Sequence, residues 1–212
     1  VFVNGLGFET WSDALINNAG GDASVVVATA GVEPILVDGE IDPHAWNALT
    51  NGVIYVENIA AAMAAADAGN ADAYKANAAS YIAKLRALHA GAADRFGSLP
   101  EDGRTVVTAH DAFGYLADSY GLNFLAPVGI DTEAEPSASE LAALIAHLKQ
   151  TGAGALFVEN ITSPALIEQI SKETGLKIGG RLFSDALSER GGPATSYVCL
   201  LYTSDAADEA IG

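Results

Sequence analysis

Residues 71–96, ADAYKANAASYIAKLRALHAGAADRF, decide the fold because they predict one long helix between two segments of a different pattern. Their apolar side chains recur at intervals of three and four residues, as on one face of an α-helix. These residues are Tyr74, Ala78, Tyr81, Leu85, Leu88, Ala92 and Phe96. Gly97 and Pro100 predict the end of this helix.

On both sides of this helix, short β-branched runs alternate with helical patterns, which is typical of parallel βα units. Before it, strands are predicted at residues 1–3 and 25–29, with a helix over 9–19 between them and another helix starting near His44. After it, strands are predicted at residues 105–109, 122–126 and 155–158, with a short helix that reaches Tyr120. The fold class is therefore α/β, with two βα lobes of parallel sheet joined by one long backbone helix.

Two helix starts carry explicit signals. Ser137 followed by Glu140 forms a capping box. Ser163 with Pro164 predicts an N-cap followed by a first-turn proline, in a helix that ends at Gly175.

The pattern divides the chain into four segments. We expect an N-terminal lobe at residues 1–68, the linking helix at 69–97, a C-terminal lobe at 98–198 and a tail at 199–212. The first lobe is expected to be incomplete, because the chain opens within a strand and without a preceding cap. The tail, which begins CLLYTSDAADE, is similar to translated sequencing-adaptor sequence, so we predict no function for it.

Composition excludes several classes of function. A formal net charge of −17 disfavours nucleic acid and anionic membrane surfaces as partners. Cys199 is the only cysteine, so a bound metal needs nitrogen and oxygen ligands. No run of about 18 apolar residues predicts a transmembrane helix.

Three residues lie where ligands bind in α/β proteins. His110 directly follows the predicted strand 105–109, and Asp185 follows a short extended run that ends before Ser184, so both are expected at strand exits. Ligands bind beyond the carboxyl ends of parallel strands. His44, in the sequence DPHAW, lies at a helix start. Taken singly, a histidine at a strand exit is more often a solvated or hydrogen-bonded loop residue, and His89 and His147 are predicted surface residues. Ligands from two lobes, however, could hold one ion.

The segments DPHAW, VTAHDAFGYLADSYGL, ALFVEN and FSDALS, in this order, resemble the marker segments of the metal-specific solute-binding proteins of ABC importers. Their spacing is similar too, since 66 residues separate His44 from His110 and 75 separate His110 from Asp185. The resemblance reaches from residue 1 to about Tyr197. It implies two lobes and a rigid backbone helix.

The resemblance implies that His44, His110 and Asp185 are three of four metal ligands, the family's first ligand being a histidine upstream of VFVNGLGFE. Histidine at position 110, where manganese members often carry glutamate, favours Zn²⁺ over Mn²⁺. A periplasmic or membrane-anchored extracellular monomer is expected, with an ABC permease as its partner. VEPILVDGEI stands in place of the acidic or histidine-rich loop of many zinc members.

Two roles stay open for Glu159, which follows the predicted strand ALFV. Its carboxylate can orient a ligand imidazole, or it can hold a loop by accepting hydrogen bonds from backbone amides. Asp42 and Asp111 are interpreted as helix-start residues.

Two other functions are weighed against metal transport. A zinc hydrolase would need a positioned base, and the chain has no HExxH motif. A sugar- or peptide-binding protein would need several aromatic side chains in its cleft. Trp11 and Trp46 are the only tryptophans, and both are predicted to pack helices.

Overall fold

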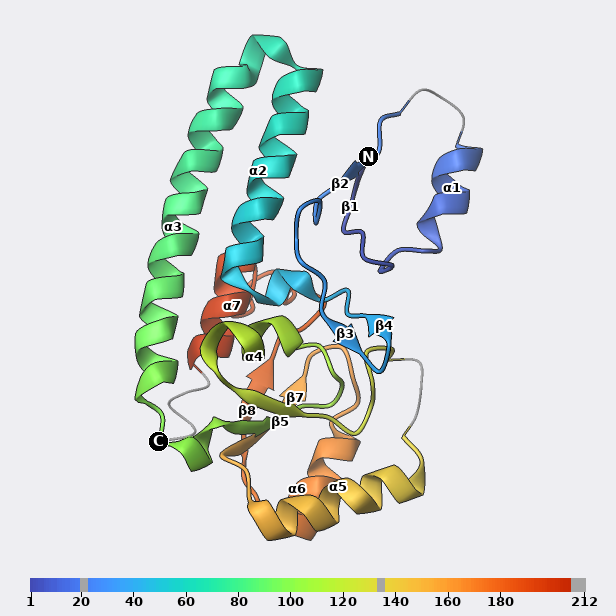
Figure 1. Cartoon of the computed structure of the whole chain (residues 1–212), viewed down its shortest axis with the longest axis vertical. Coiled ribbons are helices and arrows are strands. Elements are labelled where there is room, and N and C mark those ends of the chain that lie inside the picture. Colours follow the sequence, from blue (N-terminus) through green and yellow to red (C-terminus); the bar gives the residue numbers. More distant parts are fainter. Residues whose placement is uncertain (20–22, 133–135, 207–212) are drawn as a thin grey trace. The chain divides into compact units, whose positions relative to one another are not determined.

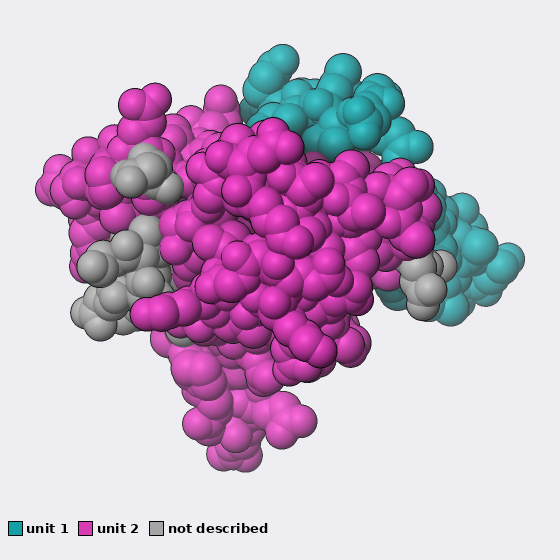
Figure 2. All heavy atoms as spheres, turned by 90° about the horizontal axis from the view of Figure 1, so that it is seen from below, with its two compact units in different colours: residues 1–89 teal, residues 90–212 magenta. Residues whose placement is uncertain are grey.

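The computed structural model describes residues 1–19, 23–132 and 136–206, in two compact units, residues 1–89 and residues 90–212 (Figure 2). The predicted long helix is α3, Ala71–Ser98, which begins in the first unit and ends in the second (Figure 1). The predicted division at residues 68/69 and 97/98 stays a prediction. In the part of the chain that the structure describes, no helix combines the length and the apolar character needed to cross a bilayer.

Unit 1 opens with a minimal parallel sheet. β1, Phe2–Val3, pairs with β2, Val26–Val27, and α1, Ser12–Asn18, lies between them in the chain. Both strands are shorter than predicted. Trp11 is 72% exposed, so the prediction that it packs a helix is wrong: it directly precedes α1, a helix of only seven residues.

A hairpin that the sequence analysis did not predict follows in unit 1. β3, Leu36–Val37, pairs antiparallel with β4, Glu40–Ile41. Asp38 and Gly39 have φ values of 51° and 89°, which a two-residue turn between twisted strands requires. The 3₁₀ helix η1, Ala45–Asn47, comes next and leads into α2, Leu49–Ala66, which lies beside β2 (Figure 1). A second 3₁₀ turn, η2, Ala68–Asn70, connects α2 to α3.

Unit 2 is built on one parallel sheet, as predicted. Its strands, in the spatial order β6-β5-β7-β8, are β6 (Asn123–Leu125), β5 (Thr105–Val107), β7 (Ala155–Glu159) and β8 (Ile178–Leu182). Its helices are η3 (Glu101–Arg104), α4 (Gly114–Tyr120), α5 (Ala138–Thr151), α6 (Ala165–Thr174) and α7 (Tyr197–Ala206). The α/β fold with a parallel sheet and a long helix is thereby confirmed.

Side chains that alternate along the central strands β5 and β7 cover the two faces of this sheet. Val106 and Phe157 belong to one buried cluster, which includes residues of α4 and the end of α3. Val107 and Leu156 belong to the other, with residues of α5 and α6. Because both faces are buried, the chemistry of the sheet is confined to its edges, and all four strands end at the same one.

The two predicted helix starts differ in outcome. The capping box is confirmed: Ser137 Oγ accepts from the Glu140 amide at 3.2 Å, and Glu140 Oε2 accepts from the Ser137 amide at 2.8 Å. At α6 the N-cap is Pro164, not Ser163, and it has no side-chain capping bond. The Ser163 hydroxyl accepts only a long bond, 3.4 Å, from the amide of Ala165.

The predicted tail begins inside α7. Leu200 and Leu201 are buried in this helix. Residues 207–212 lie outside the described part of the chain.

Candidate metal centre

His110 lies just beyond β5, at the carboxyl edge of the sheet, as predicted. It forms an isolated parallel bridge with Val128, and its carbonyl accepts a 3.0 Å bond from the buried Thr108 hydroxyl. The side chain is fully buried. A polar ring in this position requires polar neighbours, because burial without hydrogen bonds is costly.

Glu159 supplies such a neighbour from the end of β7, the strand adjacent to β5. Its Oε1 accepts hydrogen bonds from the amides of Ala109 and His110, at 2.8 and 3.0 Å. Its Oε2 lies 2.6 Å from His110 Nδ1 and accepts from the Ser184 hydroxyl at 2.7 Å. Glu159 therefore makes both kinds of contact that the sequence left open: it holds the loop, and it contacts the imidazole.

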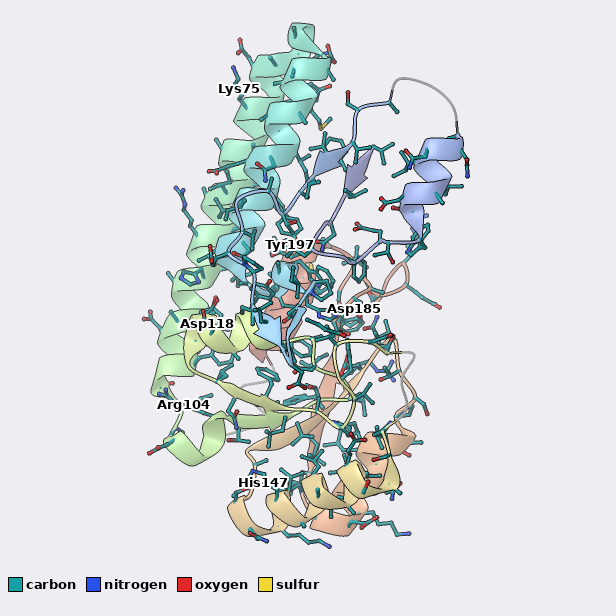
Figure 3. All side chains as sticks on the ribbon, turned by 45° about the vertical axis from the view of Figure 1, so that its right-hand side comes forward. Lys75, Arg104, Asp118, His147, Asp185 and Tyr197 are labelled. Carbon is teal, nitrogen blue, oxygen red and sulfur yellow. The ribbon has the colours of Figure 1, made fainter. Side chains whose placement is uncertain are left out.

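Asp185 completes the group from the loop after β8 (Figure 3). Its Oδ2 lies 3.3 Å from His110 Nε2, and its side chain is 15% exposed. Unit 2 thus brings His110, Glu159 and Asp185 together from the ends of three neighbouring strands. His147 lies elsewhere, exposed on α5 (Figure 3).

The two carboxylates shift the charge state of the His110 ring. Burial disfavours the imidazolium ion, but hydrogen bonds and charge attraction from Asp185 and Glu159 outweigh that effect and raise the pKa of His110 to about 9. In the absence of a metal, His110 is therefore a cation near neutral pH. A metal ion that binds its nitrogen must displace this proton.

His44 lies in unit 1, at the N-cap of η1 and therefore at a helix start, as predicted. Asp42 Oδ1 accepts from the His44 amide at 2.9 Å and lies 2.7 Å from His44 Nδ1. The ring of Trp46 packs edge-on against the imidazole, with centroids 5.2 Å apart. Backbone, carboxylate and indole together fix the orientation of the His44 ring.

Asp42 is the residue whose role the sequence interpretation missed. It was assigned to the helix start, but its carboxylate bonds to His44, and the N-cap of η1 is His44 itself. The signal was present, since aspartate accepts readily from the amide two residues further on. Asp111 does not start a helix either: α4 begins at Gly114, and the Asp111 amide donates to the carbonyls of Val128 and Gly129.

The two histidines share one arrangement. In each, Nδ1 lies within 2.7 Å of a buried carboxylate oxygen, Asp42 for His44 and Glu159 for His110. Metal-binding histidines are commonly oriented in this way, and the contact makes the other ring nitrogen a stronger donor. Imidazole nitrogen together with the carboxylate of Asp185 suits a divalent transition metal.

Comparison with known proteins also indicates a metal-binding function. Residues 1–204 match the family described as zinc-uptake complex component A, periplasmic. Iron-binding protein YfeA of Yersinia pestis is 33% identical over 205 residues, in a match that covers 93% of this chain and 65% of that protein. The manganese ABC transporter substrate-binding lipoprotein PsaA of Streptococcus pneumoniae is 32% identical over 212 residues, in a match that covers 95% of this chain and 68% of that protein. The chain thus spans about two thirds of the length of these relatives.

A solved structure is similar over the whole chain. The periplasmic zinc-binding protein TroA of Treponema pallidum superimposes with a TM-score of 0.93 at 26% identity, covering 100% of this chain and 80% of TroA. The relatives are named for three metals, so metal binding is shared while the ion differs. Because the matches extend over nearly all of the sequence, the chain belongs to the family of periplasmic metal-binding subunits of ABC importers, which are substrate-binding proteins and not enzymes.

Proposed function

We propose that this chain captures Zn²⁺ outside the cytoplasm and delivers it to the membrane permease of an ABC importer. The observation that carries the proposal is the buried His110 imidazole, which lies between Glu159 and Asp185 at the carboxyl edge of the sheet. An apolar side chain would fill the same place without the cost of burying charges, so the presence of this polar group favours a binding role.

The proposed ligands are His110 and Asp185 from unit 2 and His44 from unit 1. The matching Nδ1–carboxylate contacts of the two histidines support the inclusion of His44, because a ring held in this way is prepared to coordinate through its other nitrogen. Glu159 acts as the orienting acceptor of His110 and not as a ligand, since its two oxygens already contact two amides, a ring nitrogen and a hydroxyl.

Zn²⁺ is proposed as the cargo because two imidazoles and one carboxylate suit a borderline ion, whereas Mn²⁺ prefers more oxygen ligands. Relatives named for manganese and iron make these two ions the direct competitors. Zinc should bind most tightly, but the affinity order alone favours zinc over both at many sites, so competition must be measured.

The proposed setting follows from the relatives. PsaA is named a lipoprotein. We propose the same extracytoplasmic, membrane-anchored setting for this chain, where it acts as a monomer that docks on its permease.

Titration calorimetry of the full 212-residue chain with Zn²⁺, Mn²⁺ and Fe²⁺ tests the proposal. His110→Ala and Asp185→Ala should each weaken Zn²⁺ binding by about 100-fold or more, because each removes a ligand atom. His147→Ala is the matched control, since it removes an exposed imidazole on α5. Equal Zn²⁺ affinity of His110→Ala and His147→Ala would contradict the proposed site, and tighter binding of Mn²⁺ than Zn²⁺ would contradict the proposed cargo.

A further inference from the structure

Three polar side chains of unit 1 form a hydrogen-bonded group that reaches the backbone of the residues before and after His44. We infer that Asn4, Asn51 and Tyr55 are positioning residues that fix the backbone of this histidine, an inference that rests on the proposed role of His44 as a ligand. None of the three is proposed to contact the metal. Asn4 and Asn51 donate to the carbonyl groups of the two residues next to His44, Pro43 and Ala45, and Tyr55 acts through Asn4.

Asn4 holds the first carbonyl. It lies directly after β1, and its Nδ2 donates to Pro43 O at 3.0 Å, across 39 residues of sequence. Its Oδ1 accepts from the hydroxyl of Tyr55, which comes from α2. Both polar atoms of the Asn4 side chain are therefore bonded, Nδ2 to the loop that carries His44 and Oδ1 to α2.

Asn51 holds the second carbonyl, with Nδ2 donating to Ala45 O at 3.1 Å. Asn51, Tyr55 and Asn58 follow one another at intervals of four and three residues, so they share one face of α2. All three bond to the polypeptide beside this helix: Asn58 Nδ2 donates to the carbonyls of Ala28 and Ala30, at 2.8 and 2.9 Å. The polar face of α2 therefore bonds to three other segments of unit 1, and two of its three residues act on the surroundings of His44.

The turn that carries Asn4 is itself constrained. The carboxylate of Glu9 accepts from the amides of Asn4 and Gly5. Gly5 has φ of 88°, and a Cβ there would lie 2.5 Å from a methyl group of Val27, so only glycine fits. Asn4 therefore projects from a turn that has little freedom to move.

The His44 peptide is thus held on three sides, by Asp42 at its own amide, by Asn4 at the preceding carbonyl and by Asn51 at the carbonyl of the next residue. Metal ligands need positions accurate to about 0.5 Å, so the loss of one holding bond should reduce affinity without removing a ligand.

The experiment compares Asn4→Ala and Asn51→Ala with Asn58→Ala in the full chain, using Zn²⁺ titration and thermal unfolding. Asn58 is the matched control, because it lies on the same face of the same helix, is partly buried like Asn51, and bonds to loops that do not include His44. Asn4→Ala and Asn51→Ala should weaken Zn²⁺ binding by about three- to tenfold, less than the loss typical of a residue that contacts a ligand ring. Asn58→Ala should lower the melting temperature as much as Asn4→Ala and Asn51→Ala do, but it should leave Zn²⁺ affinity unchanged.

Tyr55→Phe keeps the inference testable if a change at Asn4 prevents folding, because it removes one hydroxyl and leaves the ring. It should weaken Zn²⁺ binding by about two- to fivefold in the wild-type background and not at all in Asn4→Ala, since Tyr55 acts through Asn4. The visible spectrum of bound Co²⁺ should shift in Asn4→Ala and Asn51→Ala but not in Asn58→Ala.

His44→Ala separates the two levels of inference. If His44→Ala binds Zn²⁺ as tightly as wild type, the proposed role of His44 is wrong. If His44→Ala weakens binding while Asn4→Ala, Asn51→Ala and Asn58→Ala retain equal affinities, His44 is a ligand and the positioning inference alone is overturned.

Discussion

Protonation of His110 links the stability of the metal-free chain to pH. Its pKa is raised from 6.5 to about 9, so the folded state binds this proton more tightly than the unfolded state does. The resulting stabilisation is fully present below pH 6.5 and is lost as the pH rises through about 9. A shift of this size corresponds to a decrease on the order of 3 kcal/mol in the free energy of unfolding.

Urea unfolding of the chelator-treated chain at a series of pH values between 6 and 9.5 measures this decrease. His110→Gln, which has no titrating ring, should show a much flatter profile over the same range. A wild-type profile as flat as that of the variant would show that folding does not raise the pKa of His110.

Glu159 offers a second test at the scale of one residue. Glu159→Gln keeps an oxygen that can accept from the amides of Ala109 and His110, but it replaces the charged partner of His110 Nδ1 with a neutral amide. We expect Zn²⁺ affinity to fall by about 10- to 100-fold with little change in the fold, as is usual for the orienting partner of a ligand histidine. Calorimetry measures the affinity and circular dichroism the fold; unchanged affinity would reduce Glu159 to a loop-holding residue.

At the scale of elements, the serines at the starts of α5 and α6 should contribute different amounts to the free energy of unfolding. Ser137→Ala removes the hydroxyl of a complete capping box and should lower the free energy of unfolding by about 1 kcal/mol. Ser163→Ala removes only a long contact beside Pro164 and should cost less than about 0.5 kcal/mol. Equal losses in urea unfolding would mean that the capping box contributes no more than an exposed serine.

Elements whose cause is local could be predicted from sequence. The capping box is set by two residues, and the stripe from Tyr74 to Phe96 by spacing alone. The hairpin of β3 and β4 was missed although Asp38–Gly39 is a strong turn signal, because the flanking strands have only two residues each. Trp11 was placed wrongly, since nothing in its local pattern reveals how much of unit 1 lies against it.

At the scale of the whole molecule, parallel topology predicted the position of the site but not its contacts. His110, Glu159 and Asp185 were recognisable as strand-exit residues, because strands that run in parallel end at a common edge. That Glu159 contacts both backbone and ring depends on the pairing of β5 with β7, which the sequence does not specify. Asn4 and Asn51 escaped notice because their partners are backbone carbonyls, which carry no sequence signal.

Binding of cargo should stabilise the whole chain, because an ion that binds only the folded state shifts the unfolding equilibrium. Zn²⁺ at 100 times its dissociation constant should add about 2.7 kcal/mol to the free energy of unfolding. At a fixed Zn²⁺ concentration the gain should be larger at pH 8.5 than at pH 6.5, since fewer His110 rings then have a proton to displace. Thermal unfolding with Zn²⁺ or with chelator measures the gain, and an equal gain at both pH values would contradict proton displacement.

Glu159 contacts both the backbone of the His110 loop and the His110 ring, whereas Asp185 contacts the ring, so the two carboxylates have different roles. The Glu159 carboxylate is bonded to two backbone amides, so it cannot move away with a departing ion. The loop that carries His110 therefore keeps its position when the ion leaves. Asp185 is the more exposed of the two carboxylates, with 15% of its side chain exposed. The contacts of Glu159 therefore keep this end of the sheet ordered without help from a bound ion.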